Sequence, residues 1–266
     1  MQLADGVSRI EIEGVGIEVA VRGTGKPLLF LHPEIGIDPA APVLAHLAKK
    51  AQVIAPSHPG FGHSELPRAM NSVEDLGYFY LDFLDALDLK DAILVGASLG
   101  GWIAAAITVK STARFSHLVL AASVGIKAGD REHRDIADIF ATTEPQFAEL
   151  AYFDPAAAKR DLTALPEAEL VTIARNREAT ARFAWSPYMH DPKLKGRLHR
   201  IRIPSLVLWG ASDRIAAADY GRALAGALPG ARFELIERAG HYPHLEQPEQ
   251  FARKILAFTG LAESAP

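Results

Sequence analysis

Gly96-Ala97-Ser98-Leu99-Gly100 decides the fold, because it joins an apolar run to a helix through a very short turn. Ala92-Ile93-Leu94-Val95 stands before it, and Gly101-Trp102-Ile103-Ala104-Ala105-Ala106 follows it as a good helix start. A turn this tight forces strained dihedral angles on Ser98, and the flanking glycines remove side chains that would collide. It lifts the Ser98 hydroxyl clear of the backbone, where the helix dipole and the Leu99 N–H favour negative charge. The alternative is a glycine-rich turn with an incidental serine.

Further apolar runs on both sides of this unit predict strands buried on both faces. They are residues 28–31, 52–55, 117–121, 205–209 and 233–236. Residues 10–13 and 17–21 alternate apolar and polar, which predicts an antiparallel hairpin with one solvated face. The clearest helix runs from Ser72 to Leu87, with Ser72 and Asp75 in the positions of a capping box. Strands that alternate with helices predict an α/β fold whose parallel sheet has helices on both faces.

Residues 125–200 interrupt this alternation, because they contain only helix-like segments separated by prolines. The segment is too long for a plain crossover, so we expect a helical cap or lid over the sheet. The chain is therefore predicted to have one core, residues 1–124 and 201–266, with residues 125–200 as a cap insertion.

The candidate nucleophile Ser98 needs a base, and the base needs a carboxylate to orient it. In an open parallel sheet both come from loops at the carboxyl ends of strands. Gly210-Ala211-Ser212-Asp213-Arg214 follows one late strand, and Glu237-Arg238-Ala239-Gly240-His241 follows the next. We therefore predict Asp213 as the acid and His241 as the base, in the chain order known for this strand–serine–helix unit.

Each of these two predictions has an alternative. The alternative role of Asp213 is to cap the N-terminus of the helix that starts near Ile215, because aspartate is a common N-cap residue. Asp219 is a weaker candidate for the acid, because it falls inside that helix. His244 competes with His241, which we favour because a glycine precedes it at the end of the strand.

The 266 residues carry a net charge of −4 and include no cysteine. The mild negative charge gives no electrostatic case for nucleic acid or an anionic membrane as partner. The absence of cysteine excludes disulfides, a cysteine nucleophile and cysteine-ligated metals. The first residues have no signal-peptide pattern and no run is long enough to span a membrane, so we expect a cytoplasmic protein.

Taken together, these residues resemble the alpha/beta-hydrolase family, and the likeness covers nearly the whole chain. It includes Leu31-His32, Pro59-Gly60-Phe61-Gly62-His63-Ser64, the serine turn, Trp209-Gly210-Ala211-Ser212-Asp213 and Gly240-His241-Tyr242-Pro243-His244-Leu245-Glu246. The resemblance implies an eight-stranded, mostly parallel sheet with an antiparallel second strand and a helical cap after the sixth strand. Within the family, the chain looks most like the meta-cleavage-product (carbon–carbon bond) hydrolases and their unassigned bacterial relatives.

The resemblance implies two backbone donors for an oxyanion hole, the N–H groups of Leu99 and Glu34. The family commonly has His-Gly at the start of this loop, whereas here Pro33 follows His32 and has no N–H. A carboxylate that pointed into the oxyanion hole would oppose catalysis. We therefore expect the Glu34 side chain to face solvent or to be paired or protonated. The alternatives are that it raises the pKa of His241 or contacts a cationic group of the substrate. His58, where relatives often have aspartate, is expected to have a structural role in its turn.

The relatives that cleave carbon–carbon bonds hold a substrate carboxylate with a cap arginine, which implies Arg175 here, with Arg177 as its rival. His32, Trp185 and Tyr242 are further candidates for substrate binding, although relatives usually have tryptophan at the position of Tyr242. Several apolar cap residues form either the substrate pocket or the core of the cap: Phe140, Phe147, Tyr152, Phe153, Phe183 and Trp185.

These residues predict a serine hydrolase without a cofactor or metal that acts on a small acyl compound, either an ester or a vinylogous diketone. The alternatives on the same fold are a cofactor-free lyase or perhydrolase and a small-molecule receptor with slow turnover. The Asp nucleophile of haloalkane dehalogenases is absent, since Ser98 takes its place. The sequence predicts a small molecule as the only partner, and it leaves the oligomeric state open between a monomer and a homodimer.

Overall fold

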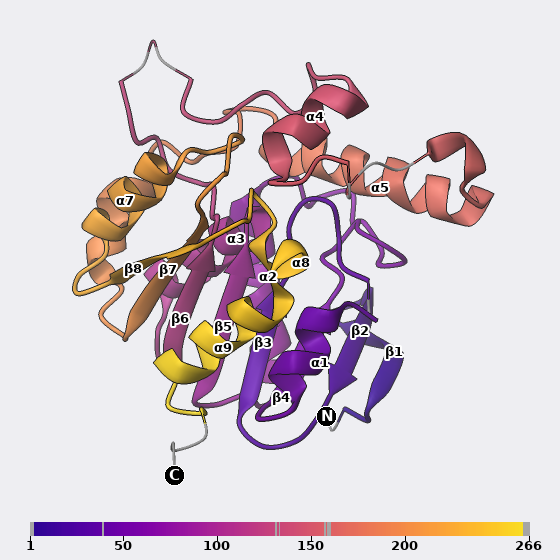
Figure 1. The fold of residues 1–266 in the computed structure, drawn as a ribbon. Helices are drawn as coiled ribbons and strands as arrows, with labels where there is room; N and C mark the ends of the chain where they lie inside the picture. Colours follow the sequence, from indigo (N-terminus) through magenta and orange to yellow (C-terminus); the bar gives the residue numbers. More distant parts are fainter. Residues whose placement is uncertain are drawn as a thin grey trace.

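The computed structural model describes residues 3–38, 40–130, 132, 134–156, 158 and 161–262. It contains an eight-stranded sheet with helices on both faces, as Figure 1 shows. The strands are β1 (Gly6–Ile12), β2 (Val15–Arg22), β3 (Pro27–Leu31), β4 (Gln52–Pro56), β5 (Ala92–Ala97), β6 (Phe115–Ala121), β7 (Ser205–Gly210) and β8 (Arg232–Ile236). Their order is β1-β2-β4-β3-β5-β6-β7-β8. β2 is antiparallel to both neighbours, and the pairs from β4–β3 to β7–β8 are parallel. The predicted α/β fold is therefore confirmed.

The predicted hairpin forms, but the predicted solvated face is present in β1 and absent in β2. The turn consists of Glu13 and Gly14, both with positive φ, and the pattern of exposed residues is confined to β1. β2 is buried along most of its length, because Ile17, Val19 and Val21 pack into the core on one face of the sheet and Ala20 packs into the core on the other. The sequence pattern identified the strands, whereas their neighbours decide which faces are covered.

The helices form two layers, and alternate strand residues pack against each layer. α1 (Pro42–Ala48) and α9 (Pro248–Phe258) cover one face of the sheet. Their buried residues belong to the same core cluster as Ile93 and Val95 of β5. α2 (Val73–Ala86), α3 (Leu99–Lys110) and α7 (Ala218–Ala227) cover the other face, which receives Leu94. The short α8 (Pro243–Glu246) directly precedes α9. Continuous burial of the central strands explains why they read as unbroken apolar runs.

The capping box at the start of α2 is present as predicted. The Ser72 hydroxyl accepts a hydrogen bond from the Asp75 N–H at 3.1 Å, and Asp75 Oδ2 accepts from the Ser72 N–H at 2.9 Å. Asp therefore replaces the more usual Glu without loss of either bond.

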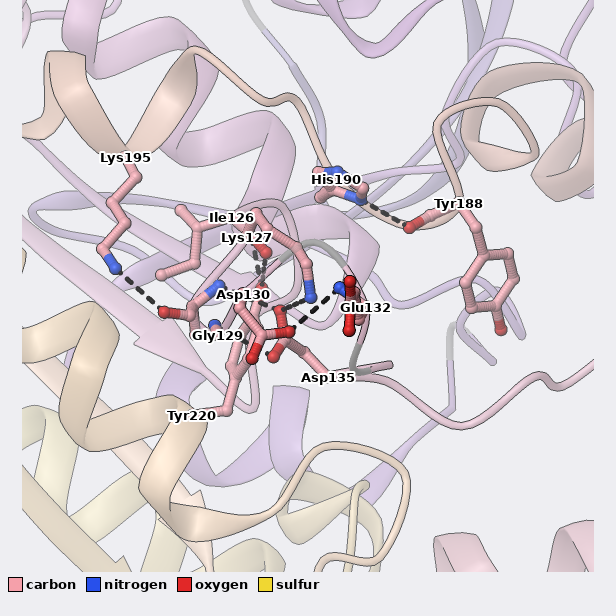
Figure 2. Close-up of polar contacts among 11 residues, drawn as sticks. Ile126, Lys127, Gly129, Asp130, Glu132, Asp135, Tyr188, His190, Lys195 and Tyr220 are labelled. Atoms are coloured by element: carbon pink, nitrogen blue, oxygen red, sulfur yellow. Dashed lines mark hydrogen bonds and ion pairs between the residues drawn. The ribbon is translucent and has the colours of Figure 1, made fainter.

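The segment between β6 and β7 contains α4 (Glu144–Ala151), η1 (Leu162–Ala164), α5 (Glu167–Ala184), α6 (Leu194–Arg197) and η2 (Leu198–Arg200). In its described part the only strand-type pairing is an isolated bridge between Gly125 and His190. Figure 2 shows how polar contacts hold its first residues: Asp135 accepts from Lys127 Nζ at 2.7 Å and from the Gly129 N–H at 3.0 Å. These contacts hold residues 127–129 next to Asp135, in the segment between β6 and α4.

α4 and α5 lie over the carboxyl ends of the strands, as Figure 1 shows. The Ala151 carbonyl, in the last turn of α4, accepts a hydrogen bond from the His241 N–H at 2.6 Å. On α5, Asn176 donates to the Ile35 carbonyl and accepts from the Gly62 N–H, both at 2.9 Å. The inserted helices therefore contact the loops after β3, β4 and β8, where the candidate site residues lie. Among the described residues, no helix combines the length and apolar character needed to cross a bilayer.

Candidate active site

The serine turn has the strained geometry that its sequence predicts. Ser98 has φ 47° and ψ −112°, and α3 begins at the next residue. A Cβ on Gly96 would lie 2.3 Å from the Gly100 carbonyl oxygen, and one on Gly100 would lie 2.1 Å from the Leu31 carbonyl oxygen. Neither glycine tolerates a side chain, so the close approach of backbone to backbone requires both. A non-glycine residue in such a conformation is a costly feature that points to function.

Ser98, His241 and Asp213 lie in one continuous line of hydrogen bonds. The Ser98 hydroxyl is 2.8 Å from His241 Nε2, and His241 Nδ1 is 2.8 Å from Asp213 Oδ2. All three residues are buried. This is the order nucleophile, base, orienting carboxylate, and each distance suits proton transfer along the line.

The second oxygen of Asp213 also makes the backbone contacts of the alternative capping role. Oδ1 accepts from the N–H groups of Ile215 and Ala216 at 2.9 and 3.0 Å. One carboxylate thus both caps the following backbone and orients His241. The rival Asp219 lies in the first turn of α7 with a side chain 96% exposed, and it is not part of the line.

The pKa of His241 lies above its ordinary value because two carboxylates face it. Burial works to lower this pKa, but the charge and hydrogen bond of Asp213 outweigh it, and the charge of Glu34 adds to the increase. The rival His244 is also buried, and burial lowers its pKa to about 3. A base that must accept a proton is better served by His241.

Leu99 and Glu34, the predicted oxyanion donors, lie after neighbouring strands. Leu99 is the first residue of α3, so its N–H has no partner within the helix. Glu34 lies in the turn after β3, which a hydrogen bond from the Gly36 N–H to the Pro33 carbonyl closes at 3.0 Å. β3 and β5 are paired at Leu31 and Gly96, which brings the two loops to the same end of the sheet.

The Glu34 side chain does not face solvent, so that expectation is wrong and the alternative of pairing is right. Glu34 is only 4% exposed, and the Tyr242 hydroxyl donates to its Oε1 at 2.5 Å. Its second oxygen, Oε2, has no hydrogen-bond partner among the residues that the structure describes. Because Tyr242 follows His241 in the chain and the rings lie 5.2 Å apart, the carboxylate is held beside the base.

A cavity of about 420 Å³ lies between this loop and the inserted helices. About half of the residues that line it belong to α4 and α5, and Phe140, Phe147 and Tyr152 contribute aromatic surface. Glu34 and Ile35 complete the wall on the side of the sheet. A pocket of this size with mostly apolar walls and a few polar groups suits a small organic molecule. Among the described residues, no cluster of three or more His, Asp or Glu is placed to hold a metal ion.

Comparisons with known proteins place this geometry in a family. Residues 28–254 match the alpha/beta hydrolase family. The chain belongs to that family.

Two relatives of the chain are a hydrolase and a lactonase by their names. The 2-hydroxymuconate semialdehyde hydrolase of Pseudomonas sp. (strain CF600) is 29% identical over 274 residues, covering 96% of this chain and 95% of that protein. The 3-oxoadipate enol-lactonase 1 of Acinetobacter baylyi is 25% identical over 266 residues, covering 95% of each. A crystal structure of a meta-cleavage product hydrolase has a TM-score of 0.78 and 20% identity, covering 97% of this chain and 99% of its own. The last likeness supports the fold alone.

Three candidate substrate-binding residues of this alpha/beta hydrolase have other partners, which corrects the predictions for them. Arg175 donates to the carbonyls of Gly62 and Ser64 at 2.9 and 2.8 Å, so its guanidinium holds α5 to the loop after β4. Trp185 is 56% exposed and packs against Phe140 outside the cavity. A side chain's direction depends on tertiary neighbours, which spacing in the sequence does not show.

His32, the third of these candidates, is closed to substrate by the backbone. Its Nδ1 contacts the Pro33 carbonyl at 2.6 Å and its Nε2 accepts from the His58 N–H at 3.0 Å. Burial lowers its pKa to about 4. His58 stacks on this ring at 3.7 Å and is itself held by the Tyr80 hydroxyl at 2.5 Å, in agreement with a structural role.

Asn176 also shapes the site, although it was not among the residues predicted from the sequence. Its side chain lines the cavity and bonds the loops after β3 and β4. An asparagine in the middle of a helix was the available signal, since this residue favours caps and turns over helix interiors. Arg177, the rival of Arg175, does line the cavity.

Proposed function

We propose that the chain is a serine hydrolase that cleaves a small acyl compound with Ser98 as nucleophile, His241 as general base and Asp213 as the orienting carboxylate. The observation that carries the proposal is the unbroken line of two 2.8 Å hydrogen bonds from Ser98 through His241 to Asp213. The strained turn at Ser98 and the family of the chain support the same function.

In the proposed mechanism, His241 Nε2 removes the Ser98 proton while the Ser98 oxygen attacks the substrate carbonyl carbon. The resulting oxyanion accepts hydrogen bonds from the backbone N–H groups of Leu99 and Glu34. His241 then gives its proton to the leaving group, and water, activated by the same base, releases the acid and restores Ser98. Asp213 holds the imidazole in one tautomer and stabilises its charged form throughout.

Residues 125–200 act in this proposal as a cap that selects the substrate. Support comes from the cavity, whose wall consists of residues between 139 and 180 apart from Glu34 and Ile35. Ser98 is fully buried and is not among the residues that line this cavity, so in this proposal the cap opens to admit the substrate to it.

The decisive experiment is covalent labelling with a fluorophosphonate, read by intact mass. We expect one label on the wild-type protein and none on Ser98→Ala, because only an activated serine attacks this reagent. Ser212→Ala is the matched control and should label fully, since Ser212 lies outside the line of hydrogen bonds. Folded protein that takes no label would overturn the proposed nucleophile.

Hydrolysis of a carbon–carbon bond is the second candidate, and the similarity to a 2-hydroxymuconate semialdehyde hydrolase favours it. Short-chain aryl esters and coloured ring-fission dienols distinguish the two reactions. Turnover of esters alone identifies an esterase, and turnover of dienols identifies the second activity. The contacts of Arg175 with backbone carbonyls argue against its use as a carboxylate anchor in either reaction.

A further inference from the structure

The Glu34 carboxylate is a buried acceptor with one oxygen used and one oxygen unused. Oε1 accepts a hydrogen bond from the Tyr242 hydroxyl, whereas Oε2 is buried and has no hydrogen-bond partner in the described part of the chain. A buried carboxylate oxygen without a partner is costly, because it has lost water and gained nothing in exchange. Glu34 also lines the cavity, although Oε2 itself has almost no accessible surface, so a molecule in that space supplies the missing donor when the side chain turns toward it.

The other charges around the cavity do not supply that donor. Glu144 and Glu149 of α4 line it, together with Arg177 of α5. Arg177 makes an ion pair with Glu144 at 3.1 Å, on the side of the inserted helices. The described wall thus carries more carboxylates than cations, and this favours a positively charged occupant over a negatively charged one.

We propose that Glu34 Oε2 binds a cationic N–H group of the substrate, so that the site prefers acyl compounds with an ammonium group close to the scissile carbonyl. The inference rests on the proposed hydrolase function and names its substrate class. The Tyr242 hydroxyl holds the carboxylate in place through Oε1 and leaves Oε2 free to accept.

An ammonium group at this position removes a conflict within the proposed mechanism. The backbone N–H of Glu34 is a proposed oxyanion donor, yet its own side chain carries a negative charge beside the same site. A substrate cation on Oε2 neutralises that charge when the oxyanion forms. A substrate carboxylate would instead be repelled by Glu34, which is the opposite of the preference that a cap arginine gives.

The test uses three phenyl esters of nearly equal shape, followed by the release of phenol. They share the same three-methylene chain and end in an isopropyl, a dimethylammonium or a carboxylate group. We expect kcat/KM to be about tenfold higher for the ammonium ester than for the isopropyl ester, and lowest for the carboxylate ester. Equal rates for the ammonium and isopropyl esters, or a preference for the carboxylate ester, would refute the proposal.

Variants locate the preference at Glu34. Glu34→Gln keeps an acceptor for the Tyr242 hydroxyl but removes the charge, so the ratio of the ammonium to the isopropyl rate should fall about tenfold. Glu149→Gln removes a charge from another part of the same cavity wall and should lower the ratio much less than Glu34→Gln does, because its carboxylate adds only to the general negative charge. A ratio that falls only in Glu149→Gln would contradict the assignment to Glu34.

The same esters separate this proposal from the proposed function. Loss of all Ser98-dependent turnover in the wild-type protein, together with failed fluorophosphonate labelling, overturns the serine mechanism itself. Ser98-dependent turnover without a preference for the ammonium ester overturns only the substrate class.

Discussion

Glu34 places a negative charge within electrostatic reach of His241, and this sets the direction of a pH effect. His241 acts as a base only when it is neutral, so the rate falls as the pH drops through its raised pKa. Removal of the Glu34 charge takes away one of the causes of that raised pKa. We therefore expect Glu34→Gln to move the acidic limb of kcat/KM for the neutral isopropyl ester to lower pH.

Tyr242→Phe is the matched control for that pH profile. It removes the hydroxyl that donates to Glu34 but keeps the carboxylate charge that acts on His241. Its acidic limb should stay above that of Glu34→Gln. An acidic limb that does not move in Glu34→Gln would show that the two side chains are not coupled.

The residues of the proposed triad were predictable because local backbone signals place them. A serine between glycines at a strand end, and an aspartate and a histidine after later strands, are visible without tertiary structure. His32, Trp185 and Arg175 were not predictable, because their roles depend on which carbonyls and rings lie nearby. Glu34 is an intermediate case, since its backbone position follows from the loop but its bond to Tyr242 joins residues 208 positions apart.

At the scale of elements, the junction of β5 and α3 depends on glycine at two points. Gly100→Ala would place a Cβ 2.1 Å from the Leu31 carbonyl oxygen, which is backbone and cannot rotate away. We expect the free energy of unfolding to fall by about 3 kcal/mol, measured by urea denaturation, with loss of fluorophosphonate labelling.

Gly77→Ala is the control for this prediction, because Gly77 is a glycine inside the buried face of α2. A Cβ there meets its nearest heavy atom, Ala106 Cβ, at 3.6 Å, an ordinary contact. This variant should be unchanged or more stable by up to about 1 kcal/mol, since alanine favours a helix over glycine. Equal losses of unfolding free energy in the two variants would mean that the close backbone approach at Gly100 does not cause the loss.

The elements themselves were easier to predict than their faces. Apolar runs located β3 to β8 to within a few residues. Burial on both faces was predicted for β8 as well, and this is wrong, because in this strand at the edge of the sheet only Ile236 is buried. The prediction of a solvated face is wrong for β2, where Val19 and Ala20 pack into the cores on opposite faces of the sheet. The helices between β6 and β7 were predicted only as a group. Their docking depends on single side chains such as Asn176 and Arg175, which contact distant loops.

At the scale of the whole molecule, buried histidines make the fold sensitive to acid. Burial lowers the pKa of His32 to about 4 and that of His244 to about 3, and it also lowers that of His58 well below its ordinary value. The unfolded chain binds protons at these residues below about pH 6.5, whereas the folded chain does not. Stability is therefore complete above that pH and falls as the pH drops toward each folded-state pKa.

His241 has a raised pKa and works in the opposite direction, whereas the pKa is lowered for the buried His32, His58 and His244 and also for His117. Near pH 5, His32 and His244 should each reduce the free energy of unfolding by about 2 kcal/mol relative to pH 7.5. Urea denaturation at the two pH values measures this loss for the whole chain.

His244→Phe tests whether the buried histidines cause the acid sensitivity. Phenylalanine preserves ring contacts with Phe30 and Phe251 but cannot bind a proton. The loss of stability between about pH 7.5 and 5 should shrink by about 2 kcal/mol in this variant, whatever its stability at neutral pH. His63→Gln, at an exposed position, should keep most of the wild-type loss. If His244→Phe loses as much stability on acidification as the wild-type protein does, protonation of His244 in the unfolded chain is not a source of the effect.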